Sequence, residues 1–264
     1  MIENFLEGKV ALITGAGSGF GREIAISFAN KGANLVLNDI NLESIEETRD
    51  IILKSSKVDV LLEQADISNE EQVSIMSKNV FNKFDNLFIL VNNAGIRGGT
   101  SSLKTKTQDY DKVMNVNVKG AWNVTKAFYK KMRKQKFEPV VGKIINMTSC
   151  AGTECGLNPF IGIYSVSKAA LLAFTKLWAL ELGPSNITVN AVCPGIFLTP
   201  IYDNDESLIR EWIKLRQIKL PINKIGESKQ VADVVLFLAS PAADYITGQN
   251  LILDGGMTIS INKL

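Results

Sequence analysis

Tyr164 and Lys168 are the two residues of this sequence whose types and spacing most directly favour chemistry. On a helix, side chains four positions apart lie on one face, about 5–6 Å apart at Cβ. A free phenol has a pKa of about 10, but a neighbouring ammonium stabilises the phenolate and lowers that pKa. Such a pair can remove a proton from an alcohol or give one to a forming alkoxide. Spacing alone is weak evidence, because many such pairs belong to an ordinary amphipathic helix.

The chain contains no histidine among its 264 residues. Nucleophilic catalysis by Ser-His-Asp or Cys-His arrangements is therefore excluded. A zinc site would have to combine thiols with carboxylates, and Cys150, Cys155 and Cys193 follow no ligand spacing. We expect no metal and three reduced, structural cysteines. Proton transfer must then use another group, such as a tyrosine.

The composition is that of a globular protein, with 46% hydrophobic residues and a net charge of +2. One domain covering residues 1–264 is the simplest prediction. The basic residues between 126 and 136 are interpreted as a solvated helix end, because the net charge does not favour nucleic-acid binding. The first residues lack the layout of a secretory signal, and no uninterrupted apolar run approaches a membrane span. We expect a cytoplasmic protein with no nucleic-acid or membrane partner.

Short β-branched runs alternate with amphipathic helical patterns along the whole sequence. This alternation, with strands apolar on both faces, predicts an α/β fold: a Rossmann-like, doubly wound parallel sheet of about seven strands with helices on both faces. The segment 198–226 breaks the alternation and is interpreted as an excursion above the sheet that carries substrate contacts. The predicted strands are 10–14, 34–38, 58–64, 87–91, 143–147, 187–191 and 250–254, and the predicted helices are 20–30, 42–54, 69–84, 109–134, 164–182 and 230–239.

A glycine-rich turn, Thr14–Gly21, lies between the first predicted strand and the first predicted helix. Glycines there let the backbone turn sharply and approach a pyrophosphate, which then lies at the helix N-terminus. The spacing differs from the G-x-G-x-x-G fingerprint, so a flexible glycine turn remains the alternative. Asn92–Gly95, at the end of the fourth strand, would let the backbone pass close to a ligand in the same way.

Asp39 ends the second predicted strand. A carboxylate at this point accepts hydrogen bonds from the adenosine ribose and repels a 2′-phosphate. Residues 14–21 include no Lys or Arg, and Ile40 follows Asp39, so no cation that could neutralise a 2′-phosphate stands in the turn. The sequence therefore favours NAD over NADP, unless Asn38-Asp39 is merely a turn.

These motifs occur in one order, and Ser149 precedes Tyr164-x-x-x-Lys168 and Pro194-Gly195. From about Leu6 to Gly256 the chain resembles the short-chain dehydrogenase/reductase family, of the classical type. It resembles members that act as sugar, polyol or 3-oxoacyl reductases without singling out one of them.

The resemblance implies a catalytic tetrad. Tyr164 would be the acid/base, and Lys168 would lower its pKa and hold the nicotinamide ribose. Ser149 would orient and polarise the substrate oxygen, and Asn117 would hold a water that leads from Lys168 to solvent. The resemblance also implies cofactor contacts by Gly15, Ser18, Gly19, Phe20, Gly21, Asp39, Ile40, Asp66, Ile67, Asn93, Ala94, Gly95, Tyr164, Lys168, Pro194, Gly195, Ile196 and Thr199.

Fifteen positions separate Ser149 from Tyr164, a longer gap than in many members of the family. We interpret it as a longer loop, which leaves the substrate open; Thr148 is the rival to Ser149. We expect substrate selection from 97–102, 151–163 and 197–217.

The sequence thus predicts an NAD-dependent oxidoreductase that transfers a hydride between nicotinamide and a secondary alcohol or ketone, such as a sugar or polyol. A 3-oxoacyl thioester reductase is the alternative, although that activity usually goes with NADPH and with basic residues near the glycine-rich turn. A non-catalytic dinucleotide sensor is a third possibility, but such relatives usually lose the tyrosine or the lysine. Family members pair helices like 109–134 and 164–182 across a dyad, so we expect a homotetramer or a homodimer.

Overall fold

The computed structural model describes residues 4–98, 101–154, 161–199, 205–215 and 220–260. Its centre is a seven-stranded parallel sheet with the order β3-β2-β1-β4-β5-β6-β9. The order reverses between β1 and β4, where a crevice opens at the carboxyl ends of the strands. The strands are β1 (Val10–Thr14), β2 (Asn34–Asp39), β3 (Val60–Gln64), β4 (Ile89–Asn92), β5 (Gly142–Met147), β6 (Ile187–Pro194) and β9 (Asn250–Leu253).

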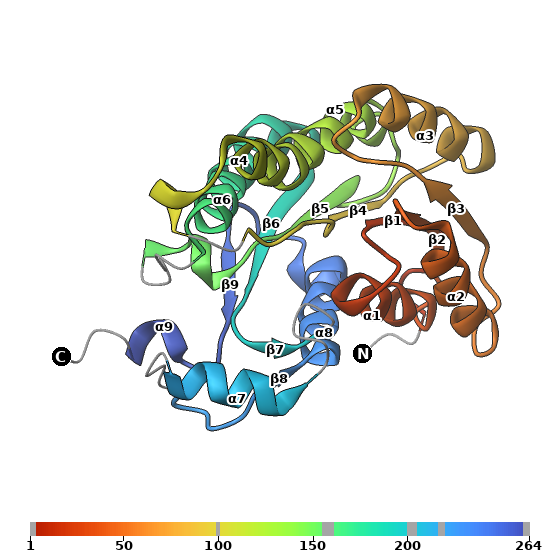
Figure 1. Cartoon of the computed structure of the whole chain (residues 1–264). Helices are drawn as coiled ribbons and strands as arrows, with labels where there is room; N and C mark the ends of the chain where they lie inside the picture. Colours follow the sequence, from red (N-terminus) through yellow and green to blue (C-terminus); the bar gives the residue numbers. More distant parts are fainter. Residues whose placement is uncertain (1–3, 99–100, 155–160, 200–204, 216–219, 261–264) are drawn as a thin grey trace.

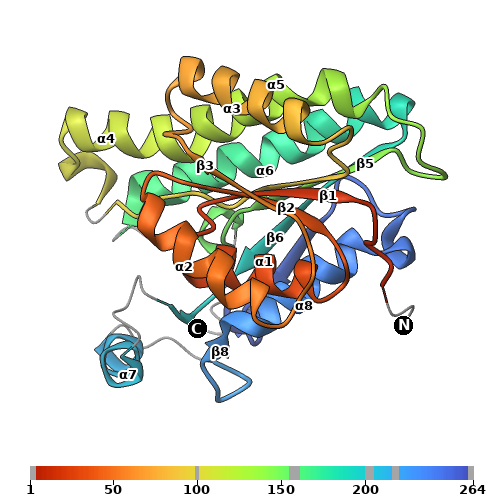
Figure 2. The same ribbon diagram turned by 90° about the vertical axis from the view of Figure 1, so that its right-hand side faces the viewer.

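Helices cover both faces of the sheet, which confirms the predicted doubly wound architecture (Figures 1 and 2). One face carries α1 (Gly19–Ala29), α2 (Leu42–Leu53) and α8 (Ser228–Ala239). The other carries α3 (Glu70–Lys83), α4 (Thr107–Met114), α5 (Ala121–Met132) and α6 (Gly162–Leu182).

The central strands are buried along their whole length because both of their faces meet helices. Every residue of β1, β4, β5 and β6 is buried, whereas the edge strands β3 and β9 are partly exposed. Phe28 and Val235 belong to the hydrophobic core on one side of the sheet, and Phe128 and Trp178 belong to the core on the other. Burial on both faces explains why the sequences of these strands are mostly apolar instead of alternating between apolar and polar residues.

The register brings the functional motifs to one edge of the sheet. Thr14 pairs with Asn38 between β1 and β2, and Asn92 pairs with Asn146 between β4 and β5. Because the strands are parallel, the residues that follow their carboxyl ends meet at the same edge.

The long helix predicted for 109–134 is interrupted in the structure. A π-helical turn, η2 (Asn115–Gly120), separates α4 from α5. Single π turns inside α-helices are frequent at functional sites. Here the turn contains Asn117, whose side chain is hydrogen-bonded to the backbone of Ile96 on another segment.

The predicted excursion at 198–226 contains β7 (Phe197–Leu198), α7 (Glu206–Leu215) and β8 (Gly226–Glu227). The two short strands pair with each other, and α7 lies apart from both helical layers (Figures 1 and 2). Ile209 of α7 is fully buried against a cluster that includes Met257 of α9 (Met257–Ser260). Within the described ranges, short 3₁₀ turns lie at η1 (Ser102–Lys104), η3 (Cys150–Gly152), η6 (Gly183–Ser185) and η8 (Pro241–Ala243).

Candidate active site

A cavity of about 440 Å³ opens at the carboxyl edge of the sheet, within the size range of small-molecule sites. It follows the crevice from the end of β2 to the start of α6. The predicted cofactor residues that line it are Gly15, Ser18, Gly19, Phe20, Asp39, Ile40, Asp66, Ile67, Asn93, Ala94, Gly95, Tyr164, Lys168 and Thr199.

The glycine-rich turn is shaped to admit an anion at the start of α1. Gly15 has a φ of +65°, and a Cβ there would lie 2.9 Å from the Cα of Ala94, so a larger residue would be both strained and crowded. Ser18 is the N-cap of α1 but makes no side-chain capping hydrogen bond. By contrast, Asn41 and Asn69 cap the N-termini of α2 and α3 with their side chains. The first turn of α1 thus keeps backbone N–H groups available for the pyrophosphate of a dinucleotide.

Gly21 lets α1 pack against this turn, although it does not line the cavity. A Cβ on Gly21 would lie 2.0 Å from the carbonyl oxygen of Gly15. We expect Gly21→Ala to lower the free energy of unfolding by about 1–3 kcal/mol through overpacking, and to weaken NADH binding because the turn must move. Thermal melts and NADH fluorescence titration measure the two effects.

Gly183 provides the matched control, because a Cβ there would meet nothing within 4 Å. Its backbone is helical, with a φ of −54°. Gly183→Ala should therefore leave NADH binding unchanged and be neutral or stabilising by about 0.4–1 kcal/mol. A Gly21→Ala protein that melts and binds like wild type would contradict the close packing of the turn.

Asp39 lies at the end of β2 and faces the same cavity. Its Oδ2 accepts a hydrogen bond from the Gly17 backbone N–H at 3.1 Å, and its Oδ1 accepts one from the Asn41 N–H at 3.2 Å. A carboxylate has about four acceptor positions, so acceptor capacity remains for two ribose hydroxyls. Together with the open start of α1, this chemistry fits the ADP half of a dinucleotide.

Tyr164 and Lys168 lie one turn apart on α6, and both line the cavity. The Nζ of Lys168 is 5.6 Å from the centroid of the Tyr164 ring. It donates a hydrogen bond to the carbonyl oxygen of Met147 at 2.9 Å, which fixes the ammonium beneath the carboxyl end of β5. The structure therefore brings the phenol and the ammonium together at the edge of a cavity large enough for a ligand.

Burial changes the acidity of this ammonium. Lys168 is only 4% exposed, and this desolvation lowers the pKa of its ammonium to about 8, while the nearby Cys193 acts in the opposite direction. The group therefore remains mostly protonated at pH 7. A positive charge in a site of low polarity acts on a neighbouring phenol more strongly than it would in water.

Asn117 joins three segments around Lys168. Its Oδ1 accepts from the Ile96 N–H at 2.8 Å, and its Nδ2 donates to the Ile96 carbonyl at 2.9 Å and to the Ser167 hydroxyl at 3.0 Å. A Cβ on Gly95 would lie 3.2 Å from both the Asn117 Oδ1 and the Lys168 Nζ. The π turn thus places the predicted fourth member of the tetrad next to the lysine, although Asn117 itself does not line the cavity.

Two hydroxyls follow β5, and their hydrogen bonds distinguish them. Thr148 lines the cavity, but its hydroxyl donates toward the Val192 carbonyl at 2.9 Å and the Cys193 Sγ at 3.0 Å. The Ser149 hydroxyl accepts from the Ala151 N–H at 3.1 Å and has a long contact of 3.5 Å with the Pro194 carbonyl. Ser149 can therefore redirect its proton more easily than Thr148, although Ser149 does not line the cavity.

The predicted residues Pro194, Gly195 and Ile196 do not line this cavity. Ile196 packs in the hydrophobic cluster with Ile209 of α7, and a Cβ on Gly195 would lie 2.6 Å from the Cβ of Asp254. Several further lining residues, which lie at or after strand ends or on α4 and η2, were not predicted from the sequence: Asn38, Ala65, Ile96, Lys112, Val116 and Met147. Most of these residues are adjacent in the sequence to a predicted site residue.

Parts of the segments predicted to select the substrate lie outside the described residues. These are 99–100, 155–160, 200–204 and 216–217, and Cys155 lies among them. Cys150 and Cys193, the cysteines within the described ranges, are buried free thiols. Burial raises the pKa of the Cys150 thiol to about 12, as expected of an unreactive structural cysteine.

Comparison with known proteins agrees with this geometry. Residues 15–258 match the family model described as enoyl-(acyl carrier protein) reductase. The chain is 38% identical over 255 residues to the 3-oxoacyl-[acyl-carrier-protein] reductase of Thermotoga maritima, covering 96% of this chain and 99% of the relative. It is 36% identical over 255 residues to a (2S)-[(R)-hydroxy(phenyl)methyl]succinyl-CoA dehydrogenase subunit of Thauera aromatica, covering 96% and 98%.

Solved structures show the same fold over nearly the whole chain. Levodione reductase superposes with a TM-score of 0.88 at 29% identity, covering 97% of this chain and 99% of that one. A short-chain type dehydrogenase/reductase from Mycobacterium marinum superposes with the same TM-score and identity, covering 97% and 98%. With its glycine-rich turn, its Tyr164–Lys168 pair and these full-length matches, the chain belongs to the short-chain dehydrogenase/reductase family.

Proposed function

We propose that this protein is an NAD(H)-dependent oxidoreductase that interconverts a secondary alcohol and a ketone. The observation that carries the proposal is the Tyr164–Lys168 pair at the cavity, with the ammonium buried and hydrogen-bonded to the Met147 carbonyl. A protein that only sensed dinucleotides would not need this pair.

The nicotinamide supplies a hydride for ketone reduction, or accepts one in the reverse direction, when the cofactor is bound. Tyr164 donates the proton of its hydroxyl to the substrate oxygen during reduction, and as a phenolate it removes the hydroxyl proton during oxidation. Lys168 stabilises the phenolate through its positive charge. Ser149 holds the substrate oxygen by hydrogen bonding, and Asn117 keeps Ile96 and α6 in place beside the lysine.

The relatives support an acyl thioester as the substrate better than a sugar or a polyol. Two of them are named for such compounds, a 3-oxoacyl group on acyl carrier protein and a substituted succinyl-CoA. Levodione reductase is named for a different kind of ketone. We therefore place a 3-oxoacyl thioester, the alternative of the sequence analysis, ahead of sugars and polyols. The reaction would consume one NADH and one proton, and would yield NAD⁺ and the 3-hydroxyacyl thioester.

The cofactor assignment depends on Asp39 at the ribose end of the cavity. Since a carboxylate repels a 2′-phosphate, NADH should bind more tightly than NADPH, by about tenfold or more. Fluorescence titration with both cofactors measures the ratio. Tighter binding of NADPH would refute the assignment of Asp39, and the cofactor would then be the one that usually accompanies 3-oxoacyl thioester reduction.

A substrate panel separates the candidate activities. NADH oxidation is measured with an acetoacetyl thioester, with a cyclic diketone and with a ketose, and NAD reduction with the matching alcohols. We expect the highest kcat/KM with the thioester. A higher kcat/KM with the ketose would favour a sugar or polyol as the substrate. Cofactor binding without turnover of any compound in the panel would favour a non-catalytic sensor.

We also propose that the protein assembles through α6. Leu177 and Leu180 of α6 are 51% and 76% exposed, respectively, although the opposite face of the helix is buried in the core. The stretch Gly162–Ser185 is long and apolar enough to cross a membrane by length and composition, with a mean hydropathy of 1.2. Because its inner face packs on the sheet and carries Lys168, we assign the outer face to a second copy of the chain. Light scattering should give a dimer or a tetramer, and Leu180→Glu should shift it toward the monomer.

A further inference from the structure

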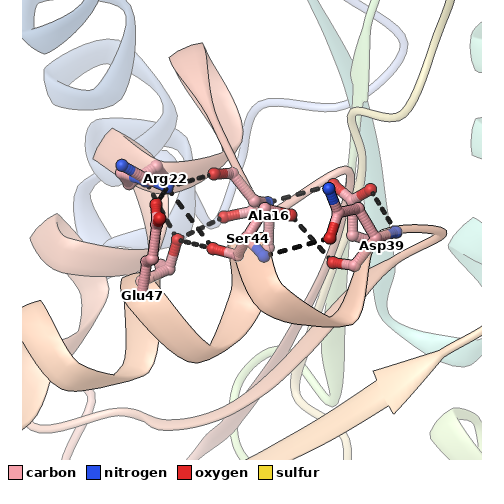
Figure 3. A network of polar contacts seen from close by, with 8 residues as sticks. Ala16, Arg22, Asp39, Ser44 and Glu47 are labelled. Atoms are coloured by element: carbon pink, nitrogen blue, oxygen red, sulfur yellow. Dashed lines mark hydrogen bonds and ion pairs between the residues drawn. The ribbon is translucent and has the colours of Figure 1, made fainter.

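Arg22 occupies the first turn of α1, one residue beyond the glycine-rich turn, and it reaches back to that turn (Figure 3). Its Nη2 donates to the carbonyl oxygen of Gly17 at 2.5 Å. The same nitrogen lies 2.9 Å from the Glu47 carboxylate and 3.3 Å from the Ser44 carbonyl, both on α2. Arg22 therefore ties the cofactor-binding turn to a neighbouring helix.

Thr48 adds a second connection between α2 and the turn. Its hydroxyl is buried, accepts a hydrogen bond from the Arg22 Nε at 3.0 Å, and lies 3.0 Å from the carbonyl oxygen of Ala16. The carbonyls of Ala16 and Gly17, two consecutive groups of the turn, are thus both held: the first by Thr48 of α2 and the second by Arg22 of α1. Each of these two carbonyl oxygens is therefore directed at a donor of the protein itself.

Both the backbone N–H and the backbone carbonyl of Gly17 are hydrogen-bonded. Its carbonyl accepts from Arg22, and its N–H donates to the Oδ2 of Asp39 at 3.1 Å. A Cβ on Gly17 would lie 2.0 Å from the Ser44 Oγ and 2.9 Å from that same Asp39 oxygen. The position of the Asp39 carboxylate is therefore linked, through one glycine, to the guanidinium of Arg22.

The charges on either side of Gly17 have different partners. Arg22 forms an ion pair with Glu47, and their side chains are 25% and 59% exposed. The Nε and Nη2 of the guanidinium donate to the turn and to α2, and Glu47 compensates its charge. Asp39 instead accepts from the backbone N–H groups of Gly17 and Asn41. The anion thus faces the cavity, while the nearest cation of this network is committed elsewhere.

We propose that Arg22 and Glu47 are positioning residues for cofactor selectivity. Arg22 fixes the Gly17 peptide, so that the Asp39 carboxylate stays at the ribose end of the cavity and rejects a 2′-phosphate. Glu47 holds Arg22 in this geometry and compensates the charge of the guanidinium, so that the guanidinium does not bind a 2′-phosphate. This inference rests on the proposed preference for NAD(H).

The test compares Arg22→Gln, Arg22→Lys and Glu47→Gln with wild type. The dissociation constants of NADH and NADPH are measured by fluorescence titration, and their ratio is the readout. We expect Arg22→Gln to lower the preference for NADH at least about tenfold, since the charged hydrogen bond to Gly17 is lost. Arg22→Lys keeps the charge but loses the planar, forked guanidinium, and should lower the preference for NADH by an intermediate factor. Glu47→Gln should lower the preference for NADH about threefold, mainly by strengthening NADPH binding.

Arg49→Gln is the matched control. Arg49 lies on the same helix as Glu47 and pairs with Asp50 at 2.9 Å, away from the turn. Its removal should leave both cofactor affinities unchanged. If Arg22→Gln does not fold, which thermal melts will show, Arg22→Lys and Glu47→Gln decide the question.

The ratio distinguishes positioning from general support of the fold. A merely structural role would weaken NADH and NADPH equally, and an unchanged ratio in the folded variants would overturn the inference. The wild-type titration tests the proposed function separately. Wild type that prefers NADPH would refute the NAD(H) proposal, whereas wild type that prefers NADH, with variants that keep the same ratio, would refute the role of Arg22 and Glu47 alone.

Discussion

Replacing Tyr164 with phenylalanine should lower kcat by about 10²–10⁴-fold, because the substrate oxygen loses its proton donor. The ring of Tyr164 lines the cavity and remains in the variant, so the dissociation constant for NADH should stay within about threefold of wild type. Steady-state kinetics with the best substrate of the panel and fluorescence titration measure the two quantities. This combination of retained binding and lost turnover is expected of an acid/base group.

Tyr245→Phe is a suitable control for the loss of a phenolic hydroxyl. Tyr245 is fully exposed and lies between α8 and β9, far along the chain from the pair on α6. Its replacement should change neither kinetics nor cofactor binding. Wild-type turnover by the Tyr164→Phe protein would remove Tyr164 from the mechanism.

Replacing Lys168 with methionine should lower kcat about 10²-fold or more at pH 7 and raise the apparent pKa of alcohol oxidation. The reason is that the phenolate of Tyr164 loses the ammonium held 5.6 Å from its ring centroid. A pH profile of the oxidation rate measures this shift. An unchanged profile would contradict a role for the charge of Lys168.

The same substitution has a pH-dependent effect on stability. Burial lowers the pKa of the Lys168 ammonium from 10.5 to about 8, so the native state binds this proton more weakly than the unfolded state. The cost of burying the charge is complete below pH 8 and disappears as the pH rises from about 8 to 10.5. Between pH 7 and pH 9, wild type should therefore gain on the order of 1 kcal/mol of unfolding free energy relative to Lys168→Met.

Urea unfolding of both proteins at the two pH values measures this gain. The exposed Lys130, on α5, provides the control, since Lys130→Met should show no comparable pH dependence. Parallel stability curves for wild type and Lys168→Met would mean that the ammonium is not desolvated in the folded protein.

Much of the fold could be predicted from the sequence because the period of the apolar residues changes between strands and helices. The strands β1 and β4–β6 are buried on both faces, and their sequences are mostly apolar. A helix start can also be predicted: Asn69, the first residue of the predicted helix 69–84, is the N-cap of α3, and its side chain accepts from the N–H groups of Glu71 and Gln72. Most motif residues could be assigned to the cavity because parallel strands end at one edge.

Features that depend on geometry between segments could not be predicted. The π turn at Asn115–Gly120 is stabilised by hydrogen bonds from Asn117 to Ile96, a contact that no local periodicity reveals. Arg22 lies just outside the motif, and only the first turn of α1 brings its guanidinium back to Gly17. Pro194–Ile196 were assigned by resemblance, but the segment packs toward α7 and Asp254 rather than lining the cavity.

A crystal structure of the complex with NAD and a non-reactive substrate analogue tests the central claim most directly. We expect the Tyr164 hydroxyl within about 2.6–3.2 Å of the analogue oxygen, with the nicotinamide ring beside it and the Lys168 ammonium next to both. A complex in which the nicotinamide lies away from Tyr164, or in which another group contacts the analogue oxygen, would contradict the proposed chemistry.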